Sequence, residues 1–196
     1  MKKVLLIAAM GLAGFAATSV QAESAFVTGT GTAAADLNLR VIIPRVLFLG
    51  VGTGAAALGA SNATVDRITY DYTTNATAIG GGAAAAVITN SGAFTPANSV
   101  PVRVVGNNGQ IVITATNPVS LLSGTDAIPF TQFSAVSGDV TLAHPALGGG
   151  TASPTLNTGS TKVTTRNAVW TYTYANTVTP PSGTYDGQIV YTASMP

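Results

Sequence analysis

Cysteine is absent from the sequence, so no disulfide bond stabilises the fold, and stability must come from apolar burial and strand pairing. Charged residues make up only 8% of the chain, far below the usual share of about a quarter, and the net charge is +1. Charges so few and so balanced provide no basic surface for nucleic acid or anionic lipid. We therefore expect no nucleic-acid partner and no electrostatic attachment to a membrane.

Residue types that carry catalysis and metal binding are equally scarce. His144 is the only histidine, and no Gly-x-Ser-x-Gly motif accompanies it, so nothing indicates a serine hydrolase. One histidine without cysteine excludes the usual zinc ligand sets, and the aspartates lack the spacing of a calcium loop. We expect no catalytic residue, no metal and no cofactor, and interpret His144 as a loop or edge residue. A hydrolase with an unrecognised site, and calcium held by Asp and carbonyl oxygens, are the alternatives.

The first 22 residues, "MKKVLLIAAMGLAGFAATSVQA", contain two lysines, an apolar run over 4–17 and small residues up to Ala22. This is the pattern of a secretory signal peptide, and the run is shorter than the roughly 18 residues that a spanning helix needs. We predict a signal peptide over 1–22, an N-terminal extension over 23–36 and a single domain over 37–196, with no later membrane span. An uncleaved membrane anchor is the alternative.

Beyond the leader, apolar and polar residues alternate in the way that is typical of β-strands. Helix signals are almost absent, and only 54–60 admits a short helix, because glycines interrupt the alanine runs. Several short strands with turns between them predict an all-β fold, a single β-sandwich of the immunoglobulin or pilin type with Gly/Ala-rich loops. We expect strands within 37–43, 45–52, 65–72, 100–117, 127–136, 138–145, 168–176 and 183–196, and long loops at 50–63, 76–86 and 147–161.

The strongest turn signal is Gly106-Asn107-Asn108-Gly109, which separates two runs rich in β-branched residues. Asn and Gly tolerate the positive φ that a tight turn requires. We therefore predict that the two runs within 100–117 pair with each other as a β-hairpin.

Three aromatic residues occupy alternate positions of one expected strand, Trp170, Tyr172 and Tyr174. Alternate residues of a strand share one face, so these side chains form a stripe. We favour packing in the sandwich or at a subunit contact, and the alternative is a platform that binds carbohydrate or another surface.

The two ends of the chain resemble those of pilin subunits assembled by the chaperone–usher route, in particular the archaic, spore-coat-U-like branch. The matching pieces are the small-residue segment "ESAFVTGTGTAAADLNLRVIIP", the short strand "LFLG", and a final alternating strand with Gly183 fourteen residues from its end and Tyr191 within it. Met195, where such pilins usually carry an aromatic residue, and the missing cysteines depart from the pattern. The rhythm of "GTYDGQIVYTASMP" is also similar to the last strand of WxL-type cell-surface domains, although no Trp-x-Leu motif is present.

The final strand raises the question of what covers its edge, because a strand edge must be paired, covered or blunted. No lysine and no internal proline blunts this one. The N-terminal segment alternates in the same way, so we predict that it pairs with the final strand, either within one chain or between subunits. The residues predicted to form this contact are Leu37, Leu39, Val41 and Ile43 on one side and Ile189 and Tyr191 on the other.

These observations lead to the hypothesis of a non-enzymatic, exported structural protein of the cell surface, a fimbrial or filament subunit that assembles by β-strand addition. The resemblance to pilins implies passage through the periplasm with a chaperone and an usher as partners. The alternatives are a monomeric secreted binding or adhesive module that uses the aromatic stripe, and a secreted hydrolase.

Export is tested by mass spectrometry of the secreted protein. We expect cleavage after Ala22, because Val20-Gln21-Ala22 places small residues at the key positions. The mature chain would then begin at Glu23, and a secreted chain that retained 1–22 would contradict the signal-peptide assignment.

Overall fold

The computed structural model describes residues 24–56, 58–59, 61–82 and 86–196. The predicted signal peptide lies outside the described residues. The chain divides into two units, Met1–Ile43 and Pro44–Pro196. The described part of the first unit, 24–43, contains no helix and no strand, and all strands found among the described residues belong to the second unit. The sandwich therefore begins at Pro44, later than the position 37 expected from the alternation.

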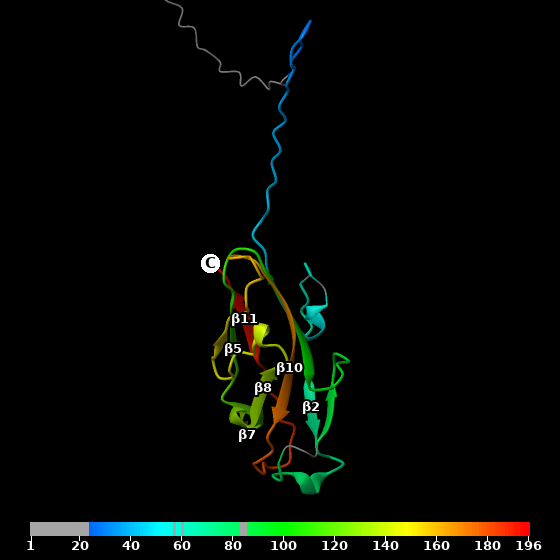
Figure 1. Cartoon of the computed structure of the whole chain (residues 1–196). Helices are drawn as coiled ribbons and strands as arrows, with labels where there is room; N and C mark the ends of the chain where they lie inside the picture. The colour runs from blue at the N-terminus through cyan, green and yellow to red at the C-terminus, as the bar shows by residue number, and fades with distance from the viewer. Residues whose placement is uncertain (1–23, 57, 60, 83–85) are drawn as a thin grey trace, which may run out of the picture. The chain divides into compact units, whose positions relative to one another are not determined.

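The unit from Pro44 to Pro196 has an all-β fold, as predicted (Figure 1). Its larger sheet has four antiparallel strands in the order β1-β4-β10-β8, and its smaller sheet has three in the order β11-β5-β9. Two further hairpins, β2-β3 and β6-β7, flank them. The bounds are β1 Leu47–Val51, β2 Ile68–Asp71, β3 Val87–Asn90, β4 Ser99–Gly106, β5 Val112–Thr116, β6 Ser120–Ser123, β7 Asp126–Pro129, β8 Phe133–Ser137, β9 Thr151–Ala152, β10 Thr164–Tyr174 and β11 Val190–Ser194.

The core lies between the four-stranded and the three-stranded sheet. Each sheet contributes one face of alternating apolar residues, as the period of a strand requires. Trp170 is completely buried, and its indole Nε1 donates a 3.1 Å hydrogen bond to the carbonyl oxygen of Leu142. The buried core cluster comprises Val100, Val102, Val104, Ile111, Ile113, Leu142, Trp170 and Tyr172.

The predicted hairpin within 100–117 is wrong. β4 pairs with β1 and β10, whereas β5 pairs with β11 and β9, so the turn after Gly106 carries the chain from one sheet to the other. The apolar faces of the two strands lie against each other across the core instead of side by side. The crossing is close, because a Cβ on Gly106 would lie 2.7 Å from the Cδ1 of Ile111. Turn chemistry alone does not distinguish these two outcomes.

Three other expected elements differ in the structure. The segment 138–145 contains a 3-10 turn, Val140–Leu142, because the carboxylate of Asp139 accepts a 2.8 Å hydrogen bond from the amide of Thr141. The segment 37–43 forms no strand, since a strand requires a hydrogen-bonded neighbour. Where the short helix at 54–60 was expected to begin there is a 3-10 turn at Gly52–Ala55, and residues 57 and 60 of that stretch lie outside the described residues.

The two faces of β5 provide a test of the sandwich. Ile113 is fully buried, whereas its neighbour Val112 is 36% exposed. We expect Ile113→Ala to lower the free energy of unfolding by about 2–5 kcal/mol, and Val112→Ala to lower it by under about 1 kcal/mol. Urea denaturation of both variants measures the difference, and equal losses would mean that β5 does not present the face described.

Candidate functional site

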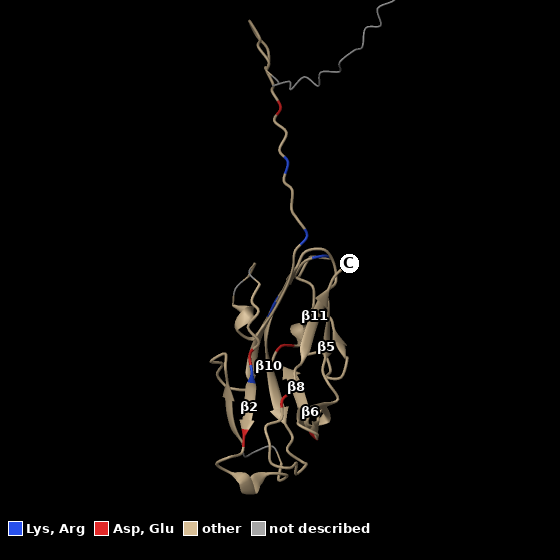
Figure 2. Cartoon of the chain, turned by 180° about the vertical axis from the view of Figure 1, so that it is seen from behind, with Lys and Arg blue, Asp and Glu red and all other residues tan. Residues whose placement is uncertain are grey.

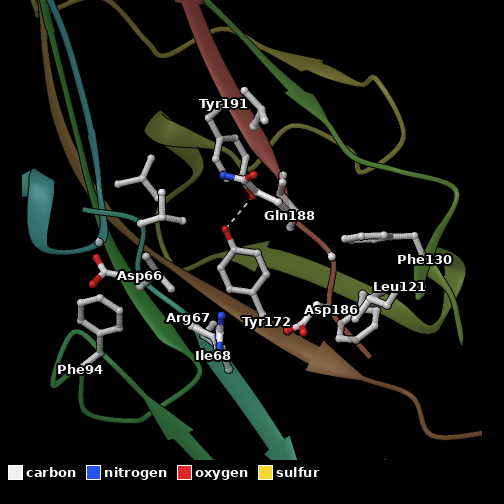
Figure 3. A pocket seen from close by; sticks show the side chains of 18 of the residues that line it. Asp66, Arg67, Ile68, Phe94, Leu121, Phe130, Tyr172, Asp186, Gln188 and Tyr191 are labelled. Atoms are coloured by element: carbon white, nitrogen blue, oxygen red, sulfur yellow. Dashed lines mark hydrogen bonds between the residues drawn. The ribbon is translucent and has the colours of Figure 1, made fainter. Parts of the chain in front are cut away.

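An open groove of about 930 Å³ runs along the side of the sandwich unit (Figure 3). One wall comes from β1 and from the stretch 64–68 that leads into β2, and the other comes from the stretch 186–191 that leads into β11. Most of the lining is apolar, so water in the groove finds few hydrogen-bond partners. Displacement of this water by an apolar segment would therefore be favourable. The large apolar lining residues are Leu49, Val51, Val65, Ile68, Phe94, Val100, Leu121, Phe130, Phe133, Ile189 and Val190.

The first wall exists because the chain turns away from the sheet directly after β1. Gly52 has a φ of 71°, and a Cβ there would overlap the carboxylate of Asp66. That carboxylate accepts hydrogen bonds from the amide of Thr53 at 2.7 Å and from its hydroxyl at 2.9 Å. The turn is therefore held against the returning chain, and β1 remains an edge strand of the four-stranded sheet.

The second wall is the final segment of the chain. Asp186 exchanges backbone hydrogen bonds with Leu122 in a single β-bridge, at 3.0 and 3.1 Å. Between this bridge and β11, the described residues Gly187, Gln188 and Ile189 belong to no β-ladder. Because successive residues of an extended chain direct their N–H and C=O groups to opposite sides, Gly187 and Ile189 direct theirs away from Leu122. This wall therefore offers backbone groups to another strand.

The expected strand over 183–196 is thus a regular strand only at its end, over Val190–Ser194. The alternate apolar residues Ile189, Tyr191 and Ala193 pack against the core. Val190 is 51% exposed and lies on the outer face. β11 pairs with β5 on one side and is the outer strand of its sheet on the other.

Two tyrosines form the floor of the groove and connect the two sheets. The hydroxyls of Tyr172, from β10, and Tyr191, from β11, are 2.7 Å apart (Figure 3). The hydroxyl of Tyr191 also lies 2.7 Å from the Nε2 of His144. The His144 ring packs edge-on against Trp170, with the two ring centroids 4.7 Å apart. His144 therefore lies in a loop, as predicted, and its ring packs at the margin of the core.

Burial keeps these groups uncharged. It lowers the pKa of His144 to about 4 and raises the pKa of Tyr191 to about 12. The pKa of Tyr172 is raised by burial and by its neighbour Tyr191. At neutral pH the floor is consequently a neutral hydrogen-bonded chain that an apolar occupant can cover at little electrostatic cost.

The predicted aromatic stripe faces inward. Trp170, Tyr172 and Tyr174 are 0%, 7% and 6% exposed, and Tyr174 stacks on Phe133 with ring centroids 5.0 Å apart. The stripe is part of the core rather than an exposed platform, because the face of β10 that carries it packs between the sheets. Only Tyr172 reaches the groove.

The other predicted contact residues lie in two places. Ile189 and Tyr191 line the groove. Leu37, Leu39, Val41 and Ile43 belong to the separate N-terminal unit and are 83%, 86%, 83% and 76% exposed. Sequence reasoning did not find the opposite wall at 64–68 or the contributions of Leu121 and Phe130, because no local pattern brings these distant segments together.

Comparisons with family models, curated proteins and solved structures found no match for this chain. Within the described residues no group of three His, Cys, Asp or Glu side chains is placed to hold a metal ion. Among the described residues there is also no helix with the length and apolarity needed to cross a membrane.

The pKa of His144 predicts a pH dependence of stability. The unfolded ring takes up a proton near pH 6.5 and the folded ring only near pH 4, so protons favour the unfolded chain. The contribution of His144 is fully present above pH 6.5 and is lost as the pH falls towards 4. Allowing for screening of the part-exposed ring, we expect a loss of about 1–2 kcal/mol.

The measurement is the free energy of unfolding between pH 7 and pH 4 for the wild type and for His144→Gln. The variant should lack this loss, so the two curves should differ in slope between pH 6.5 and 4. Hydrogen bonds from Thr73 and Thr141 lower the pKa of Asp71 and Asp139, but both proteins share these groups. Parallel curves would show that His144 is not desolvated.

Proposed function

We propose that this protein is an exported, non-enzymatic structural subunit that assembles into filaments at the cell surface by β-strand addition. The described part of the N-terminal unit of one copy, residues 24–43, which we call the extension from here on, inserts into the open groove of another. The observation that carries the proposal is the coexistence of an unfilled apolar groove with an extension whose apolar side chains are exposed.

The extension has the properties of an inserting strand. Its four alternating apolar side chains, at positions 37, 39, 41 and 43, are at least three-quarters exposed. Contiguous apolar surface of this kind on a folded protein marks an interaction site. Burial of each such side chain is worth about 1.5–3 kcal/mol, so the segment gains substantially from a partner that accepts one face of a strand.

The groove has the properties of an acceptor. It presents apolar side chains on its floor and walls. The backbone of Gly187 and Ile189 is directed to its open side, and β1 and β11 are both edge strands. In strand addition, main-chain hydrogen bonds supply affinity while alternate side chains fill pockets, and these features of the groove support that role.

The sparse charge suits a densely packed polymer. Figure 2 shows few charged residues, spread along the described chain. Subunits with a near-neutral surface repel one another weakly when they are packed together. The charge is also too low to blunt the open edge, which leaves pairing as the way to protect it.

An unassembled subunit with an open edge is prone to aggregate. Such a subunit needs protection between export and assembly, which supports a periplasmic chaperone and an usher as partners, in agreement with the resemblance to pilins. The predicted signal peptide supports the exported location.

The double substitution Leu39→Asp and Val41→Asp tests the proposal. Both side chains are exposed and lie outside the sandwich unit, so the domain should remain folded. Loss of two apolar contacts, each worth about 1.5–3 kcal/mol, should weaken assembly by about a hundredfold or more. We expect filaments of the mature wild type in negative-stain micrographs and folded monomers of the variant on size exclusion.

The matched control is Asn38→Asp with Ile42→Asp, which adds the same charge to the opposite face of the same segment. This variant should still form filaments. Assembly that survives in the inner-face variant, or that fails equally in both, would contradict insertion of the 37–43 face.

A further inference from the structure

We propose that Arg40 of the incoming extension pairs with Asp186 of the accepting subunit, and that this ion pair sets the register of the inserted strand. The inference rests on the proposed function, because it concerns the same groove. The alternation of apolar residues alone would permit several alignments of the inserted strand. The ion pair selects one of them.

Asp186 is a fixed and accessible carboxylate on the rim of the groove. Its backbone is held by Leu122 through two hydrogen bonds, and the residue is exposed to solvent. Gln188, Val190 and Thr192 are exposed at the following alternate positions, so they continue the same outward face. Figure 3 shows Asp186 and Gln188 along this wall.

The extension carries one cation that can meet this carboxylate. Within 24–43 the charged residues are Asp36 and Arg40. Arg40 lies between Leu39 and Val41, so in an extended strand it points away from the apolar face. When that face enters the groove, Arg40 lies on the outer side, where Asp186 is.

The opposite wall does not compete for Arg40. The carboxylate of Asp66 is already bound to the amide and hydroxyl of Thr53. Its neighbour Arg67, which also lines the groove, would repel a second guanidinium. Electrostatics therefore directs Arg40 to the wall of Asp186.

The backbone supports the same alignment. The N–H and C=O groups of Asp186 are directed at Leu122, so a residue opposite it on the groove side forms a pair without backbone hydrogen bonds. Such pairs bring side chains closest in an antiparallel ladder. Gly187 and Ile189, whose backbone groups face the groove, would then pair with Leu39 and Leu37.

Side-chain sizes match in this register. Leu39 lies opposite Gly187, which has no side chain of its own, and a Cβ there would approach Leu121 within 2.8 Å and Phe130 within 3.1 Å. Leu39 would therefore pack next to Leu121 and Phe130. Four residues further on, the small Ala35 lies opposite the large Tyr191. A large residue meets a small one at these two positions, and Leu37 lies opposite Ile189 between them.

The pair also requires an antiparallel strand. A parallel strand with Arg40 at Asp186 would place Pro44 and Arg45 beside β11. Asn107 of their own domain holds this region, through the carbonyl of Pro44 and the amide of Val46, both at 2.8 Å. These residues cannot leave that domain to line a neighbour.

The antiparallel register leads to an open chain of subunits. It brings Ile43 of the donor to the Gly183 end of the accepting segment. The donor's own Pro44 lies at the other end of its sandwich, near Asn107 and Asn108, the latter of which contacts Pro196. Contacts between unlike ends repeat from copy to copy, and they build a filament when the rotation between copies does not close a ring.

Cysteine cross-linking tests the register, since the natural chain has no cysteine. One full-length mature protein carries Asn38→Cys or Ala34→Cys, and a second carries Gln188→Cys or Thr192→Cys; all four positions are exposed. The proteins are mixed in pairs under mild oxidation, and linked dimers are quantified on non-reducing gels. We expect Asn38→Cys to link to Gln188→Cys and Ala34→Cys to Thr192→Cys.

The two crossed pairings should not link, because they are offset by four residues, about 13 Å, beyond the reach of a disulfide. Adding Arg40→Asp to the Asn38→Cys protein should lower its yield about tenfold, from a lost attraction and a new repulsion. Adding Asp186→Arg to the Gln188→Cys protein should restore the yield.

The failures of the two proposals are distinguishable. Filaments that form while the expected pairs do not link, or while Arg40→Asp has no effect, would overturn the ion pair and leave strand addition standing. Folded monomers with no link in any of the four pairings would overturn strand addition itself, and the ion pair with it.

Discussion

The candidate site depends on two strand edges, those of β1 and β11, that are not paired with another described strand within the sandwich unit. β1 and β11 are the outer strands of their two sheets on the same side of the core, and no described strand lies between them. The chain turns away after Val51 at Gly52, and the stretch that leads into β11 reaches only the bridge between Asp186 and Leu122. The groove opens between the stretches 64–68 and 186–191, and its apolar lining follows from its position at the margin of the core.

The interior around this groove is held without disulfides and with few charges. Trp170 and the valines of β4 pack against Ile111 and Ile113 from the opposite sheet. Where the sheets part, the hydroxyls of Tyr172 and Tyr191 connect them, and His144 completes the chain of hydrogen bonds. Polar groups at a margin satisfy one another there while remaining neutral, so the floor stays compatible with an apolar occupant.

The exposed extension and the open groove are energetically related. Each exposes apolar surface that water solvates poorly, and each lacks the hydrogen-bonded neighbour that a strand requires. Insertion of the extension of one copy into the groove of a second copy would bury the apolar surface of both and would give each a hydrogen-bonded neighbour. This relation is why we interpret the extension as part of an interface rather than as a linker.

The amino-acid sequence determined the all-β class, the location of most of the longer strands and the alternation of the extension, because the period of a strand is a local property. The strands at 87–90, 120–123 and 151–152 were not predicted, and the strand expected at 138–145 is a 3-10 turn. It also excluded helices and disulfides by composition. Tertiary structure alone decided which strands are neighbours: the runs on either side of Gly106 lie in different sheets because each finds its partners far away in the chain. The same holds for the candidate site. Ile189 and Tyr191 were identified from alternation, but the opposite wall at 64–68 and the packing of His144 against Trp170 depend on contacts between distant segments, which no local pattern encodes.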